Sequence, residues 1–183
     1  MYKNFFKLFL LTGLTLFLVS CAVKVPVLEE KNTSKLAHLL QSLDSNISYA
    51  NARHLSQDIF MQTAVLTQKF QMTSPPQYHN FLVNVGLKDK GLCYHWSDAL
   101  YAYFRQQNYP SFEFHLIASH RGEYWREHNA LLVGIKSKKI EEGIVIDPWR
   151  HSGILYFSTL KDDTKYHWVH RPSRGCKRDS LLD

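Results

Sequence analysis

The sequence predicts an α+β fold in which N-terminal helices come first and an antiparallel sheet follows. Between residues 34 and 70, apolar side chains recur at spacings of three and four, which is typical of amphipathic helices. After Pro110 the period changes to two, and several short runs rich in β-branched and aromatic residues follow one another. A chain that reads as helices and then as strands favours an α+β arrangement over an alternating one.

The first 20 residues have the pattern of a secretory signal peptide. Two lysines give a positive start, and the apolar run 5–19 is shorter than the about 20 residues that span a membrane. Leu18-Val19-Ser20-Cys21 resembles the bacterial lipobox, which implies that Cys21 is lipidated and begins a mature envelope lipoprotein. Under the enterobacterial sorting rule, Ala22 at the next position implies the outer membrane, with the domain facing the periplasm. An ordinary signal peptide with an unrelated cysteine is the alternative.

The rest of the chain is predicted to form a tether, residues 21–33, and one domain, residues 34–183. The formal net charge of the sequence is +6, but the basic residues are scattered along it. No stripe of basic and stacking residues suggests a nucleic-acid partner. The expected partners are therefore the membrane, through Cys21, and a protein or peptide substrate in the envelope.

Helices are predicted on both sides of a proline pair. The segment 44–48 separates two helices, with Ser45 or Ser48 as the cap of the second. Ser74-Pro75-Pro76 ends that helix, and residues 77–92 form a loop or a short helix.

Another helix is expected from Cys93 to Gln106. Trp96, Leu100 and Tyr103 share one face, and Cys93 opens the same stripe one turn earlier. The strands that follow are short, and residues 136–143 are read as a hairpin connection between two of them. The predicted strand segments are 112–116, 129–135, 143–147, 154–157 and 166–169.

Cys93, His128 and Asp147 form a candidate nucleophile site. A thiolate is the reactive form of cysteine, and a helix N-terminus stabilises negative charge. A histidine can take the thiol proton and return it, while a carboxylate orients the imidazole. Cys93 lies at an expected helix start, His128 begins a strand and Asp147 ends the next one. A hairpin at 136–143 sets position 128 opposite 148 or 149, so His128 and Asp147 are expected to lie side by side.

These three residues lie in motifs that resemble those of the transglutaminase-like superfamily. Gly91-Leu92-Cys93-Tyr94-His95-Trp96 is similar to its Gly-x-Cys-aromatic nucleophile motif. His128 before an apolar strand, and Asp147 in Val145-Ile146-Asp147-Pro148-Trp149, resemble its second and third motifs in the same order. The similarity covers roughly residues 75–160.

The resemblance implies a papain-like core, in which the nucleophile helix and other N-terminal helices pack on an antiparallel sheet. It also implies acyl transfer through a thioester, ending in hydrolysis (a peptidase or amidase) or in transfer to an amine. No cofactor is expected.

An oxyanion formed in such a reaction needs hydrogen-bond donors. The backbone N–H of Cys93 is one candidate, and the side chain of Gln77, Asn80 or Asn84 is another; the sequence does not choose among these three. No metal site is expected, because the Cys-x-His spacing of Cys93 and His95 suits structural zinc poorly. His95 is expected to face away from the cleft and to be non-catalytic.

Two alternatives stand against catalysis. Cys93 and Cys176 form a disulfide in an oxidising envelope, or Cys93 is an inert buried thiol. A chain that keeps the same fold without catalysis is then a binding or assembly module for envelope partners.

Overall fold

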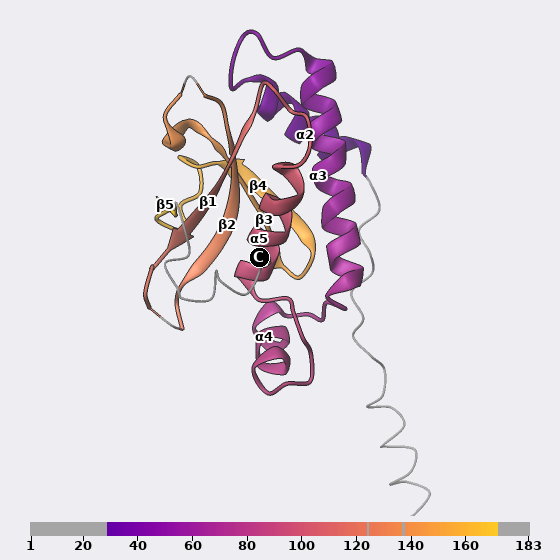
Figure 1. Cartoon of the computed structure of the whole chain (residues 1–183), viewed down its shortest axis with the longest axis vertical. Helices are drawn as coiled ribbons and strands as arrows, with labels where there is room; N and C mark the ends of the chain where they lie inside the picture. Colours follow the sequence, from indigo (N-terminus) through magenta and orange to yellow (C-terminus); the bar gives the residue numbers. More distant parts are fainter. Residues whose placement is uncertain (1–28, 124, 137, 172–183) are drawn as a thin grey trace, which may run out of the picture.

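The computed structural model describes residues 29–171 except 124 and 137, and within them it has four helices followed by a five-stranded antiparallel sheet. The predicted α+β class is confirmed. The strand order is β4-β3-β2-β1-β5, and the helices lie together on one side of the sheet (Figure 1). The helices are α2 (Glu30–Gln41), α3 (Tyr49–Lys69), α4 (Pro76–Asn84) and α5 (Cys93–Phe104), with a 3-10 turn η1 (Ile140–Glu142). The strands are β1 (Glu113–Ser119), β2 (His128–Gly134), β3 (Ile144–His151), β4 (Ile154–Thr159) and β5 (Val169–His170).

The helix boundaries follow from local chemistry. The hydroxyl of Ser48 accepts a hydrogen bond from the N–H of Asn51 at 3.2 Å and so caps α3. Of the two cap residues that the sequence offered, Ser45 and Ser48, the second is therefore the cap. Pro76 occupies the first turn of α4, where its missing N–H costs nothing. Helix α2, the first within the described residues, begins at Glu30, inside the segment 21–33 that the sequence assigns to a tether.

The central strand β2 is buried along its whole length, which explains its nearly continuous apolar sequence. Its residues alternate between two apolar clusters. One cluster includes Leu131 and Val133 and faces the helices, and the other contains Ala130 and Leu132 on the opposite side. The second cluster is completed by Ile117, Val145 and Trp168, with Ile140, Leu160 and Tyr166 partly buried against it.

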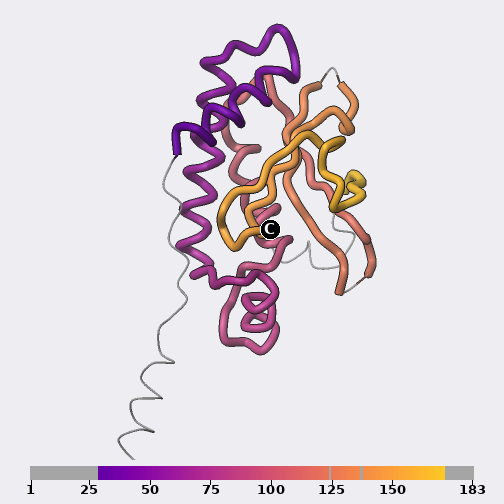
Figure 2. Tube along the Cα trace, turned by 180° about the vertical axis from the view of Figure 1, so that it is seen from behind, coloured from indigo at the N-terminus to yellow at the C-terminus, as the bar shows by residue number. Residues whose placement is uncertain are grey.

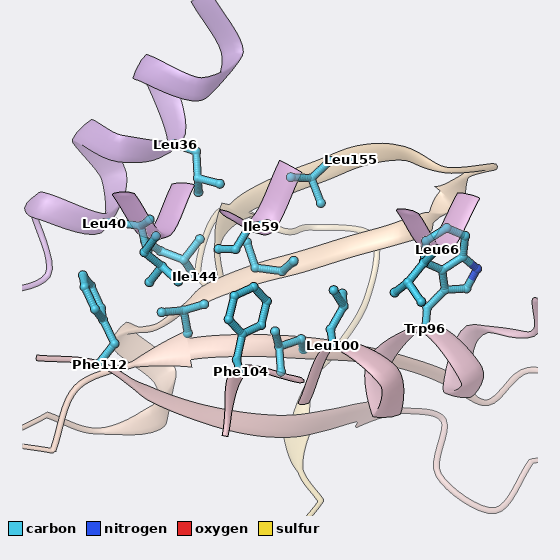
Figure 3. Packing of buried hydrophobic residues seen from close by; sticks show 14 of the residues in the cluster. Leu36, Leu40, Ile59, Leu66, Trp96, Leu100, Phe104, Phe112, Ile144 and Leu155 are labelled. Atoms are coloured by element: carbon cyan, nitrogen blue, oxygen red, sulfur yellow. The ribbon is translucent and has the colours of Figure 1, made fainter. Parts of the chain in front are cut away.

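Helix α5 lies between α3 and the sheet and contacts β1, β2 and β3 (Figure 1). Trp96, Leu100 and Phe104 are fully buried on the face that meets the sheet, and they pack among side chains from α2, α3 and the strands (Figure 3). Cys93 lies at the start of this face, one turn before Trp96, so packing of the helix fixes the position of the thiol.

Helix α4 lies beyond the end of α5 that carries Cys93, as both views of the chain show (Figures 1 and 2). It contacts β3. Within the described part of the chain, no helix combines the length and apolar character needed to cross a membrane. Strand β5 is shorter than the predicted segment 166–169 and pairs with β1 at the sheet edge.

Candidate active site

The turn before α5 is held by a buried histidine that packs against a glycine. Gly91 has φ +128°, and a Cβ placed there would lie 2.1 Å from Nε2 of His79. The backbone N–H of Thr73 donates to His79 Nδ1 at 3.1 Å, so Nε2 carries the proton and donates to the carbonyl of Lys90 at 2.9 Å. Burial lowers the pKa of His79, which agrees with this neutral form. Only glycine fits at position 91, two residues before Cys93.

The first turn of α5 is capped by its own third residue. The N–H groups of Gly91 and Leu92 donate to Nδ1 of His95 at 3.1 and 3.2 Å. His95 therefore has a structural role at the helix start. The next backbone donor along the chain is the N–H of Cys93, at the positive end of the helix dipole.

His128 at the start of β2 meets Asp147 in the middle of β3, a strand that continues to His151 and so does not end at Asp147 as the sequence predicted. In the ladder between β2 and β3, Leu131 pairs with Ile146, and this register brings the start of β2 beside the far end of β3. Nε2 of His128 lies 2.7 Å from Oδ2 of Asp147. The two side chains are 3% and 1% exposed, so they form an ion pair out of contact with water.

The thiol of Cys93 lies close enough to the same imidazole to contribute to the raised pKa of His128. Because Asp147 occupies Nε2, the ring nitrogen left for the thiol is Nδ1, which is buried and makes no hydrogen bond within normal limits to the described residues. Cys93 Sγ also lies 3.8 Å from the carbonyl oxygen of Glu127 and 3.8 Å from Nδ2 of Asn129. The structure thus gathers all three predicted residues at one place.

Burial and charge oppose each other at His128. Burial disfavours the imidazolium, but the charge and hydrogen bond of Asp147, with a smaller effect of Cys93, outweigh it and raise the pKa of His128 to about 9. At Asp147, burial likewise opposes ionisation, yet the charges and hydrogen bonds of His128 and Arg150 lower its pKa below the usual range. The histidine therefore stays protonated at neutral pH.

The sequence analysis missed the residues that bind Asp147 in addition to His128. Nε of Arg150 donates to Oδ2 of Asp147 at 2.9 Å, and its backbone N–H donates to Oδ1 at 3.2 Å. The far end of the guanidinium binds both oxygens of Asp163 at 3.1 and 2.6 Å. The indole N–H of Trp168 donates to Asp163 at 2.8 Å. No sequence motif marks Asp163, which lies beyond β4.

Aromatic rings enclose the imidazole. The centroids of Trp149, Tyr166 and Trp168 lie 4.8, 4.5 and 5.4 Å from that of His128. Because these rings exclude water, the interaction between His128 and Asp147 is stronger than it would be at the surface.

One of the three side-chain candidates for an oxyanion donor, Asn80, is hydrogen-bonded to one of these aromatic residues. Asn80 accepts a hydrogen bond from Trp149 Nε1 at its Oδ1, at 3.0 Å. An indole only donates, so the oxygen of Asn80 faces Trp149 and its NH₂ group is directed elsewhere. Gln77 and Asn84 are exposed on α4.

A second ion pair lies beside the thiol. The guanidinium of Arg171 binds both the carboxylate of Glu127 and the side-chain oxygen of Asn129. Asn129 in turn donates to Glu127 at 3.2 Å. These contacts join the end of the described chain to Glu127 before β2 and to Asn129 within it, and no sequence motif indicates them.

Several predicted residues lie outside the described part of the chain. Cys21, the lipidation candidate, and Cys176, the candidate disulfide partner, are among them. Cys93 is the one cysteine within the described residues, where it forms no disulfide. Within the same residues, no three His, Cys, Asp or Glu side chains gather as a metal site would require.

Comparison of the chain with protein-family models, with curated proteins and with solved structures finds no match. Inferences about function therefore depend on the site itself. Its parts are a thiol at a helix N-terminus, an imidazole that can exchange a proton with it, and a carboxylate that orients the imidazole. Such an arrangement can perform nucleophilic attack on an acyl carbon, with general acid–base assistance.

Proposed function

We propose that this protein is a cysteine acyl-transfer enzyme with a papain-like core of the transglutaminase-like type. The observation that carries the proposal is that Cys93 and Asp147 both act on His128, with Cys93 at the start of a helix, His128 at the start of β2 and Asp147 within the neighbouring β3. The order of the three residues along the chain and their local structures agree with the motifs they resemble.

In the proposed reaction, the thiol proton already resides on His128, and the sulfur of Cys93 attacks the carbonyl carbon of an amide as the thiolate. The negative oxygen that forms is stabilised by the backbone N–H of Cys93 and by a side-chain donor, for which the placement of Asn80 beside Trp149 is the most suitable. The intermediate collapses to a thioester as His128 returns its proton to the leaving amine.

The thioester is then cleaved by water, which gives a carboxylic acid, or by an amine, which gives a new amide. His128 takes a proton from the attacking molecule, and Cys93 leaves as the thiolate, which restores the starting charges of the pair. Asp147 accepts a hydrogen bond from His128 throughout and does not itself exchange protons. Protein and peptide amides are the substrate class we propose.

Labelling with iodoacetamide at neutral pH, without reductant, tests whether Cys93 is an activated thiol. The position of the label is read by peptide mass spectrometry, and a Cys176→Ser variant confines it to Cys93. We expect rapid labelling of Cys93 that is slowed at least about tenfold in His128→Gln, because the variant removes the proton acceptor.

Two outcomes would overturn the proposal. A Cys93 in the wild-type chain that reacts only after reductant is added would show the disulfide with Cys176. A Cys93 that reacts equally slowly in both His128 forms would show an inert thiol and favour a binding module. For a reactive Cys93, a peptide library incubated with and without added amines separates hydrolysis from amide transfer.

We further propose that the protein is a lipoprotein of the bacterial envelope, anchored through Cys21 in the outer membrane and facing the periplasm. The lipobox-like Leu18-Val19-Ser20-Cys21 supports this localisation. Mass spectrometry of the N-terminal peptide tests it: a Cys21 without diacylglycerol in the processed protein would refute the anchor.

A further inference from the structure

A buried ion pair lies next to Asp147, and none of the acyl-transfer steps described above uses it directly. Arg150 and Asp163 are 8% and 5% exposed, and their side chains are joined by two hydrogen bonds. The guanidinium of Arg150 also lies over the ring of Tyr156, 3.6 Å from its centroid. An arrangement with this many directed contacts holds the guanidinium in one orientation.

Charges alternate in sign along this buried network. Protonated His128 is followed by the carboxylate of Asp147, the guanidinium of Arg150 and the carboxylate of Asp163. Oδ2 of Asp147 accepts from both cations, from His128 at 2.7 Å and from Arg150 at 2.9 Å. The two cations therefore share one oxygen.

The proposed reaction changes one of these charges. Each time His128 gives up its proton, it becomes neutral, and the buried carboxylate of Asp147 loses a counter-charge. A guanidinium does not lose its proton in proteins, so Arg150 remains a cation through both half-reactions. The carboxylate of Asp163 binds the far end of the guanidinium and offsets its positive charge, which limits the effect of Arg150 on the pKa of His128.

We propose that Arg150 and Asp163 are positioning residues of the active site: Arg150 keeps Asp147 ionised and aimed at His128 when the imidazole is neutral, and Asp163 orients Arg150 and offsets its charge. This proposal rests on the proposed function, because it assigns the pair a part in the proton cycle of His128.

Besides Asp147, two titratable groups of the described residues face His128. Cys93 approaches from α5, and Tyr166 approaches from the segment before β5. Glu127 and Arg171 neutralise each other beside the thiol. A change confined to Arg150 or Asp163 therefore acts on His128 mainly through Asp147.

The test uses two variants of the full chain that should shift the titration of His128 in opposite directions. Asp163→Asn leaves the charge of Arg150 unbalanced, which should lower the pKa of His128 by about 1 unit. Arg150→Gln removes the competing cation, which should raise the pKa by a similar amount. The double variant should fall between them.

The readout is the NMR titration of the His128 ring, assigned with His128→Gln, together with the alkaline limb of kcat/KM. Arg150→Lys is the matched control, since it keeps the charge but loses the fork that binds Asp163. We expect its His128 midpoint to stay within about 0.3 units of wild type, with a lower kcat and an unchanged KM.

A purely structural pair would change thermal stability and leave the His128 midpoint in place. An unchanged midpoint in Asp163→Asn, or shifts of the same sign in both variants, would overturn the proposal. Asp163→Asn is nearly isosteric and keeps an oxygen acceptor, so it carries the test if Arg150→Gln does not fold. The titration needs no turnover: an inactive wild type would refute the proposed function alone, and an active enzyme with unshifted midpoints would refute the positioning role alone.

Discussion

The raised pKa of His128 makes the stability of the fold depend on pH in a direction that can be calculated. In the unfolded chain a histidine titrates near 6.5, and in the folded protein the pKa of His128 is raised to about 9, mainly by Asp147 against the effect of burial. The folded state therefore binds the proton more tightly. A difference of 2 to 3 pKa units corresponds to about 3 kcal/mol of unfolding free energy, since each unit contributes about 1.4 kcal/mol.

This contribution is complete below pH 6.5, where both states are protonated, and it is lost as the pH rises through 9. Urea unfolding of wild type and of His128→Gln, measured at pH 6 and at pH 10, isolates it. We expect the free-energy difference between the two proteins to be about 3 kcal/mol larger at pH 6. Comparing the two proteins at each pH removes the contribution of all other titrating groups, because both proteins carry them.

A difference between the two proteins that does not change with pH would refute this reasoning. It would mean that the pKa of His128 is the same in the folded and unfolded states, so that Asp147 does no more than offset the effect of burial. A larger difference at pH 10 would be a stronger contradiction, because it would show that burial outweighs Asp147.

Other changes probe the turn that carries the nucleophile and the candidate oxyanion donor. In Gly91→Ala, the new Cβ meets the ring of His79 at 2.1 Å and the backbone keeps a φ that alanine disfavours, so we expect a loss of at least about 2 kcal/mol by urea unfolding and slower labelling of Cys93. Equal stability would show that the turn relaxes. In Asn80→Ala, kcat should fall about 100-fold because the oxyanion loses a donor. Stability should fall by about 1 kcal/mol, because the indole N–H of Trp149 loses its acceptor. Gln77→Ala, exposed on the same helix, is the control and should retain full activity.

The sequence was sufficient to predict the fold class and the order of elements because both depend on local periodicity. The stripe formed by Trp96, Leu100 and Cys93 placed the thiol at a helix start, and the hairpin between β2 and β3 placed His128 near Asp147. Both inferences need only short stretches of chain. The exact register was open, yet every register allowed by the hairpin kept the two strand ends together.

The residues that the sequence missed are joined by contacts between distant positions. Asp163 follows β4 in the chain and binds Arg150 in β3. Arg150 lies in the part of β3 where the pairing with β4 shifts register, between Asp147 and His151. The hydrogen bonds of Arg171 span more than 40 residues back to Glu127 before β2 and to Asn129 within β2. No periodicity or motif encodes such pairs, because an isolated Arg or Asp in a sequence is most often a surface residue.

The buried charges also bear on the alternatives to catalysis. Removing four charged side chains from water costs free energy that ion pairs recover only in part, and apolar residues of similar size are often as stable. An inert thiol, or one in a disulfide with Cys176, has no need of an imidazolium beside it. A general acid–base pair does, because the imidazole must change its charge in a water-free site while its carboxylate stays ionised. The network around Asp147 supplies what the catalytic interpretation requires and what a structural cysteine does not, so its contacts favour the enzyme over the binding module.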